Sequence, residues 1–159
     1  MTDFPLMAGP NIATMAAALR KNCIEYVLKG VCSDQSSSLY VTEFAFPYWI
    51  RLSSDEKFIS LNTYIETSDG VSDDEYLELA NRLNDEFLLI QFHFDRDLRR
   101  LSGVYMVPAR SGVTEPQFLV LARLFPGIFA EATASRNARG ELVPSQAAPC
   151  QLIVIEGDP

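Results

Sequence analysis

The sequence has few of the residues that build metal and disulfide sites. It contains one histidine, His93, and three cysteines, Cys23, Cys32 and Cys150, with no Cys-x-x-Cys pair. A structural zinc site needs several thiolates, imidazoles or carboxylates that converge on one point, so we expect no metal site. Because the cysteines are odd in number and widely spaced, and a chain of 159 residues does not need disulfide bonds, we expect free thiols.

Motifs for cofactor binding and catalysis are also missing. The eight glycines are scattered and form neither a GxGxxG nor a GxxxxGK[ST] sequence, so no phosphate-binding loop is predicted. Nucleophilic catalysis with an imidazole base requires His93, which falls on the polar face of its expected strand beside Gln91 and Asp95. The paired acids Asp73 and Asp74 suit a helix start. We therefore expect no catalytic residue and no cofactor.

Positive charge is scarce as well. Thirteen Lys and Arg residues against 21 Asp and Glu residues give a net charge of −8, which disfavours a broad phosphate-binding surface and a nucleic-acid partner. Tyr48 and Trp49 are accordingly expected in the core or on a sheet surface. No apolar run approaches the roughly 18–20 residues of a membrane span, and Met1–Asn11 lacks the features of a secretory signal. We expect a cytoplasmic protein with no membrane partner.

What the sequence does contain is the composition of a folded α+β domain. Of its 159 residues, 48% are hydrophobic and 21% charged, close to the averages of soluble globular proteins. We predict one domain over residues 1–134. Residues 135–159 are predicted to form a linker, Ser135–Ser145, and an apolar strand-like tail, Cys150–Glu156, that needs a partner edge.

Three segments have the periodicity of amphipathic helices. Apolar residues recur at helical spacing from Ile12 to Cys23. Ser72 and Glu75 have the spacing of a capping box, in which two side chains satisfy the free backbone N–H groups of a helix start. A similar start at Thr114 opens a third helix, in which Pro126 removes a backbone hydrogen bond and can kink the helix.

Alternation of apolar and polar residues predicts an antiparallel sheet. The extended candidates before the second helix are Glu25–Lys29, Leu39–Phe46, Tyr48–Leu52 and Phe58–Ile65. The candidates after it are Leu88–Asp95 and Leu101–Pro108, joined as a hairpin by a charged turn. The order of elements that we predict is α-β-β-β-α-β-β-α. It has three strands before the second helix, although four extended candidates lie there. Four arginines lie in or near this hairpin: Arg96, Arg99, Arg100 and Arg110. They either form a charged tip that prevents aggregation or bind an acidic motif of a partner.

The third helix has more apolar surface than one core contact needs. Its expected core stripe consists of Phe118, Leu121, Ala122, Phe125, Ile128 and Phe129. Leu119, Val120 and Leu124 widen the apolar surface beyond this stripe. We therefore predict these three as partner-binding residues, together with Leu152 and Val154 of the tail.

The order of elements and several segments resemble the YbjN family, bacterial proteins labelled as sensory-transduction regulators. The segments that carry this resemblance are Phe58–Thr63, Asp74–Asn84, Gln91–Asp95, Leu101–Met106 and Gly112–Phe118. It covers about residues 10–134 and not the tail, and it includes an Asn near the end of the middle helix and a Gly-hydrophobic-Thr entry into the last one. The resemblance implies a type III secretion chaperone-like fold, an antiparallel sheet flanked by helices, often self-associated and without enzymatic activity.

Three hypotheses about function follow. The first is a non-enzymatic regulatory or chaperone-like module that binds a protein or peptide partner and forms a homodimer. The alternative is a small-molecule sensor or enzyme with a pocket between sheet and helices, lined by Phe92, Tyr105 and Phe118. In the third, Cys150–Glu156 adds as a strand to a neighbouring sheet.

Overall fold

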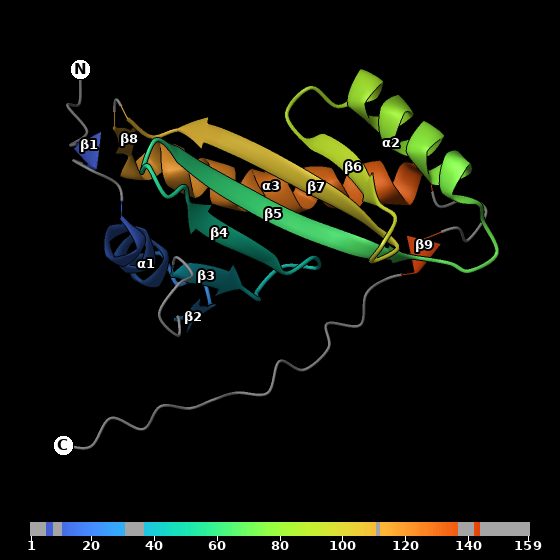
Figure 1. Cartoon of the computed structure of the whole chain (residues 1–159). Coiled ribbons are helices and arrows are strands. Elements are labelled where there is room, and N and C mark those ends of the chain that lie inside the picture. Colours follow the sequence, from blue (N-terminus) through green and yellow to red (C-terminus); the bar gives the residue numbers. More distant parts are fainter. Residues whose placement is uncertain (1–5, 8–10, 31–36, 111, 137–141, 144–159) are drawn as a thin grey trace.

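The computed structural model describes residues 6–7, 11–30, 37–110, 112–136 and 142–143 (Figure 1). Three helices flank one antiparallel sheet: α1 (Ile12–Lys21), α2 (Asp73–Glu86) and α3 (Glu115–Arg136). The strands of this sheet are β2 (Tyr26–Lys29), β3 (Ser38–Val41), β4 (Tyr48–Leu52), β5 (Phe58–Thr67), β6 (Gln91–Asp95), β7 (Arg100–Pro108) and β9 (Leu142–Val143). Their spatial order is β2-β3-β4-β5-β7-β6, with β9 paired to β5. This arrangement confirms the predicted α+β fold class.

Between α1 and α2, the predicted element order was one strand short. Four strands, β2 to β5, lie between α1 and α2, because the third and fourth extended candidates form separate strands that pair with each other. The candidate Leu39–Phe46 ends as a strand at Val41, and Phe46 packs its ring 5.1 Å from that of Phe129 in the core. Leu88 and Leu89 precede β6 and are exposed. A small second sheet that the sequence did not reveal joins β1 (Leu6–Met7) to β8 (Val113–Thr114).

The predicted helix starts are confirmed by their hydrogen bonds. The carboxylate of Glu75 accepts a 3.0 Å bond from the backbone N–H of Ser72, whose hydroxyl in turn accepts from the N–H of Glu75. Thr114 and Gln117 form the same reciprocal pair at the start of α3. Each pair satisfies backbone donors that a helix leaves free at its N-terminus.

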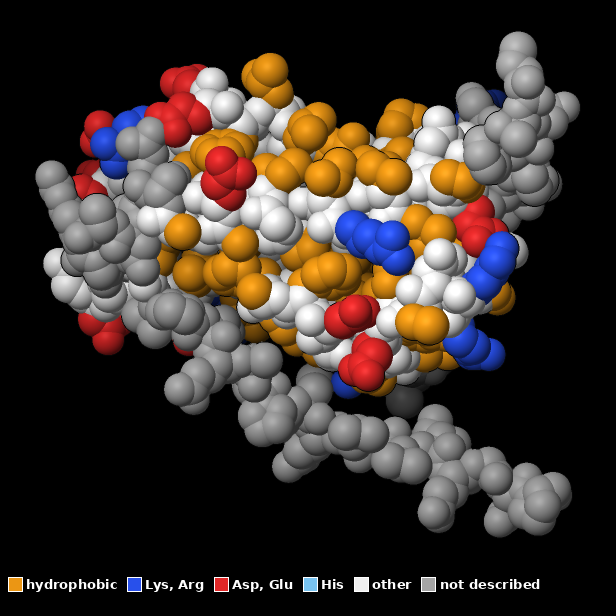
Figure 2. Space-filling model, turned by 180° about the vertical axis from the view of Figure 1, so that it is seen from behind, with side chains coloured by type: hydrophobic (Ala, Val, Ile, Leu, Met, Phe, Trp, Pro, Cys, Tyr) orange, Lys and Arg blue, Asp and Glu red, His pale blue; other side chains and the backbone are white. Residues whose placement is uncertain are grey.

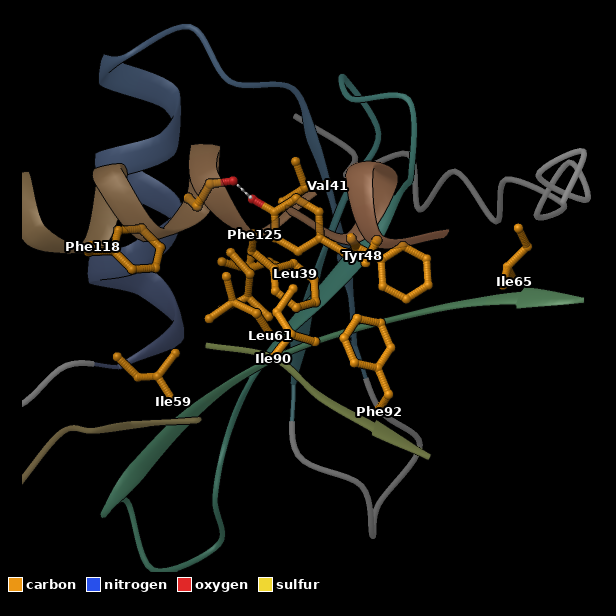
Figure 3. Close-up of a cluster of buried hydrophobic side chains, with 14 of the residues drawn as sticks. Leu39, Val41, Tyr48, Ile59, Leu61, Ile65, Ile90, Phe92, Phe118 and Phe125 are labelled. Atoms are coloured by element: carbon orange, nitrogen blue, oxygen red, sulfur yellow. Dashed lines mark hydrogen bonds between the residues drawn. The ribbon is translucent and has the colours of Figure 1, made fainter. Parts of the chain in front are cut away.

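The core lies between the sheet and the helices (Figure 3). Along β5, Ile59, Leu61, Thr63 and Ile65 are buried, while Ser60, Asn62 and Tyr64 between them are more exposed. On β4, Tyr48 is fully buried and Trp49 lies on the other face of the sheet, as predicted. Figure 1 shows α3 running behind β5 and β7, so the buried sheet face is the one that α3 covers.

The long helix packs closely on the sheet at Gly103 of β7. A Cβ atom at this glycine would lie 2.6 Å from a ring carbon of Phe129, which is itself fully buried. Gly103 therefore lets α3 approach the sheet. The helix continues through Pro126 to Arg136. The boundary predicted at residue 134 thus falls inside α3.

The segment predicted as a linker contains a strand. Leu142 and Val143 form β9, which pairs with Thr67 and Glu66 at the end of β5. Leu142 is buried, so an apolar contact holds this strand on the sheet. The predicted tail strand Cys150–Glu156 lies outside the described residues.

Candidate protein-binding surface

The third helix has one buried and one exposed apolar face. Val120 and Leu124, four residues apart on one side of the helix, expose 55% and 49% of their surface. Leu119 instead is only 9% exposed and belongs to the core. It lies one turn after Glu115, whose carboxylate pairs with Lys21 of α1 at 2.9 Å, so α1 covers this side of α3. Of the three helix residues predicted to bind a partner, only Val120 and Leu124 are accessible.

A groove runs beside these two residues. Between α3 and the end of β7 it has a volume of about 490 Å³, and its apolar lining consists of Val107, Pro108, Val113, Pro116, Val120 and Leu121. A smaller hollow continues from Leu121 to Leu124 and Leu89. We call Leu89, Val107, Pro116, Val120, Leu121 and Leu124 the α3 surface. Figure 2 shows hydrophobic side chains gathered in a band across this side of the molecule.

The groove is bordered by a short free strand edge. Strand β6 pairs with β7 only from Arg100 to Val104, whereas β5 pairs with β7 along its whole length. Backbone groups of successive strand residues point to alternate sides, and Ala109 donates to Lys57 on the β5 side. Met106 therefore directs its N–H and C=O away from β5, and Pro108 has no N–H to offer. Among the described residues, this edge offers the N–H and C=O of Met106 and the C=O of Pro108.

Part of this surface was predictable from the sequence. The structure brings Val120 and Leu124 together with residues of β7 and with Leu89, which the sequence analysis had assigned to a strand. The run Leu88-Leu89, between α2 and β6, carried a signal, since two adjacent leucines cannot both face one side of a strand. Leu152 and Val154 of the predicted site lie outside the described residues.

No known protein-family profile and no curated protein matches the sequence. Among solved structures, the chain is similar to YbjN from E. coli, described as a proposed transcription regulator. The two are 18% identical, the match covers 88% of this chain and 100% of YbjN, and the TM-score is 0.71. The chain has a YbjN-like fold. A second match is to the HopA1-SchA chaperone-effector complex, with 14% identity, coverage of 79% of this chain and 92% of that chain, and a TM-score of 0.51.

These matches confirm the fold that the resemblance implied. The YbjN-like fold extends to a chain from a chaperone-effector complex, so the predicted chaperone-like architecture is also confirmed. Neither similar structure is described as an enzyme.

The alternative pocket does not form at the residues predicted to line it. Phe92 and Phe118 are each only 2% exposed, and the ring of Phe92 stacks 5.9 Å from that of Phe129. The space beside Tyr105 measures about 20 Å³, room for about one water molecule and far less than the roughly 300 Å³ or more of a typical ligand pocket. In this YbjN-like fold, side chains of the core fill the place where the alternative hypothesis put a ligand.

The hairpin arginines mainly bind their own chain. The guanidinium of Arg99 donates to the carboxylate of Asp73 at 2.7 Å and to the carbonyl oxygens of Ser68 and Val71, each at 3.1 Å. These contacts fasten the β6–β7 turn to the start of α2. Arg100 lies 3.8 Å from Glu66. Arg99 and Arg100 thus have intramolecular partners, which neither of the two predicted roles included.

The remaining candidates for chemistry are dispersed. His93 is exposed on β6, as predicted, and Cys23 is an exposed free thiol. Within the described ranges, no three His, Cys, Asp or Glu side chains gather as a metal site would require. Nor does any helix in these ranges have the length and hydrophobicity needed to cross a membrane.

Proposed function

We propose that this protein is a non-enzymatic protein-binding module with a regulatory or chaperone-like role in the bacterial cytoplasm, and that it forms a homodimer through the α3 surface. The observation that carries the proposal is the exposure of Val120 and Leu124 beside an apolar groove. Large contiguous apolar patches on a soluble protein commonly mark interaction sites.

A second copy of the chain suits this surface for two reasons. Burying apolar surface stabilises a complex by roughly 25 cal/mol for each Å² removed from water. A partner surface that excludes water from Val120 and Leu124 would therefore favour association. In a twofold dimer each copy presents the same patch, so the groove of one copy can receive the exposed side chains of the other.

The two structural matches support the choice of function class. One is described as a proposed transcription regulator and the other comes from a chaperone-effector complex, and both share the fold rather than the sequence of this chain. Protein binding is the activity that the second description names. We extend protein binding to this chain because its α3 surface offers an apolar site outside the core.

Sedimentation equilibrium tests this proposal. The wild-type chain is expected to dimerise in the micromolar range, and Leu124→Glu is expected to sediment as a monomer because the interface would bury an unpaired charge. Leu98→Glu is the matched control, since Leu98 is 59% exposed in the β6–β7 turn, away from this surface. A wild-type monomer, or equal dissociation by both variants, would contradict the proposal. Circular dichroism of both variants verifies that they fold.

The tail has a subsidiary role in the proposal. Leu152 and Val154 belong to an apolar segment, and the free N–H and C=O of Met106 offer it two backbone hydrogen bonds at the groove. Deleting residues 148–159 should then weaken assembly without unfolding the domain. Unchanged stability and unchanged assembly would exclude a docking role for the tail.

A further inference from the structure

The sheet has a second face, which the helices do not cover. On β5, Ser60, Asn62 and Tyr64 alternate with the buried residues and point away from α3. Figure 1 shows no helix in front of β5 and β7 on the side opposite α3. We call this side the open face; the neighbouring strands contribute Lys29, Tyr40, Trp49, Arg51, Arg100, Ser102 and His93 to it.

Aromatic rings form a row across the open face. The rings of Tyr40 and Trp49 lie 4.6 Å apart, and Trp49 stacks on Tyr64 at 5.8 Å with an interplanar angle of 14°. A hollow of about 330 Å³ lies next to this row, lined by Trp49, Arg51, Asn62, Tyr64, His93, Arg100, Ser102 and Val104. The hollow combines flat apolar surface with polar groups that can donate hydrogen bonds.

One end of the open face carries two cations, although the whole chain is acidic. Strand register places Lys29 and Arg51 on either side of Ser38, and neither forms an ion pair with any residue that the structure describes. Arg100 holds its guanidinium 4.1 Å from the centre of the Tyr64 ring and 3.8 Å from the carboxylate of Glu66. The carboxylate of Asp95, which also lies on this face, accepts hydrogen bonds from the β6–β7 turn. The end of the face that carries Lys29 and Arg51 is thus cationic in a chain of net charge −8.

We propose that the open face binds an extended acidic segment of a partner protein that carries an aromatic side chain. Acidic side chains would pair with Arg51 and Lys29, and the aromatic one would lie in the hollow against Trp49 and Tyr64. Neighbouring strands are about 4.8 Å apart, so the path from Lys29 on β2 to β7 is about 19 Å, the span of about six extended residues.

The shape of the site favours a peptide over other anions. A small molecule in a typical pocket is largely enclosed, whereas this hollow lies on a sheet face and the cations extend beyond it to β2. Nucleic acid would bring a continuous line of phosphates toward an acidic protein. An acidic segment needs only local charge pairing, because salt screens the more distant acids beyond about 8 Å under physiological conditions.

Trp49 provides a direct assay, because it is the only tryptophan of the chain. We would titrate the full chain, at physiological salt, with a random copolymer of glutamate and tyrosine and follow tryptophan emission. Saturable quenching is expected. Arg51→Glu should weaken binding by about tenfold or more, since it replaces an attraction with a repulsion. Arg123 is an exposed residue of α3, on the opposite side of the sheet from the open face. Arg123→Glu makes the same change of charge and should change the affinity by less than about twofold.

Each other outcome overturns the proposal in a distinct way. Unchanged emission at high polymer concentration would mean that the face does not bind acidic peptide. Equal weakening by both variants would show a response to net charge alone. Stronger quenching by single-stranded oligouridylate would identify a nucleic-acid surface, and a change of emission with protein concentration alone would identify a second copy. Leu124→Glu should leave the response intact, which separates this inference from the proposed dimer.

Discussion

The hydroxyl of Tyr48 donates a 2.6 Å hydrogen bond to the carbonyl oxygen of Ala122 in α3. In an uninterrupted helix this oxygen accepts from the backbone N–H four residues later, but the residue at that position is Pro126, which has no N–H. Tyr48 therefore replaces the hydrogen bond that the proline removes. The contact also joins β4 to the helix that carries the α3 surface (Figure 3).

Removing this hydroxyl should destabilise the fold. Tyr48→Phe leaves the buried carbonyl of Ala122 without its donor, and we expect a loss of about 1–3 kcal/mol in the free energy of unfolding. Urea denaturation measures this loss. Tyr26→Phe is the control, because the Tyr26 hydroxyl accepts its hydrogen bond from the exposed side chain of Arg20, at 3.1 Å, rather than donating to a buried carbonyl. Equal losses in the two variants would show that the bond to Ala122 has no special role.

The same tyrosine should make stability depend on alkaline pH. Burial, with a smaller contribution from the nearby Glu43 carboxylate, raises the pKa of Tyr48 well above its ordinary value. Above about pH 10 the phenol ionises in the unfolded chain but stays neutral in the folded one, so the free energy of unfolding falls as pH rises. Denaturation from pH 8 to 11 should show a shallower fall in Tyr48→Phe than in the wild type. Parallel curves would contradict this cause.

Asn84 should stabilise the edge of the sheet. Its side-chain amide accepts a 2.6 Å hydrogen bond from the N–H of Phe92 and donates a 2.9 Å hydrogen bond to the carbonyl oxygen of the same residue. Asn84 thus makes the two backbone hydrogen bonds that another strand at this edge would make. We expect Asn84→Ala to cost about 1–3 kcal/mol in thermal or urea unfolding. Asn81→Ala, on the exposed side of the same helix, should change stability by less than about 0.5 kcal/mol. A harmless Asn84→Ala would refute this role.

A methyl group at Gly103 should disturb the contact between α3 and the sheet. Gly103→Ala forces the buried ring of Phe129 to move, at an expected cost of about 1–3 kcal/mol. Gly127→Ala, for which a Cβ has open space in α3, should instead stabilise the chain by about 0.5–1 kcal/mol, because alanine favours a helix. Differential scanning calorimetry compares them, and a rise in Tm for both would contradict the close approach.

The sequence predicted the features that depend on nearby residues. The capping pair Ser72 and Glu75 is three residues apart, and the alternation along β5 is local, so both were identifiable. The burial of Leu119 depends on α1, almost a hundred residues earlier in the chain, and periodicity alone did not indicate it. The open face likewise depends on the register of strands, which places Trp49 of β4 beside Tyr64 of β5. No local pattern specifies that register.

The most direct test of the proposed binding surface measures side-chain exposure in the unmodified protein. Hydroxyl-radical footprinting with mass spectrometry would compare oxidation of Leu124 and Val120 at protein concentrations below and above dimerisation. Leu28 and Leu98, which are 58% and 59% exposed and lie elsewhere, serve as internal references. We predict that oxidation of Leu124 and Val120 falls on dimerisation while that of Leu28 and Leu98 does not change. Undiminished oxidation of Leu124 in a dimer would contradict it.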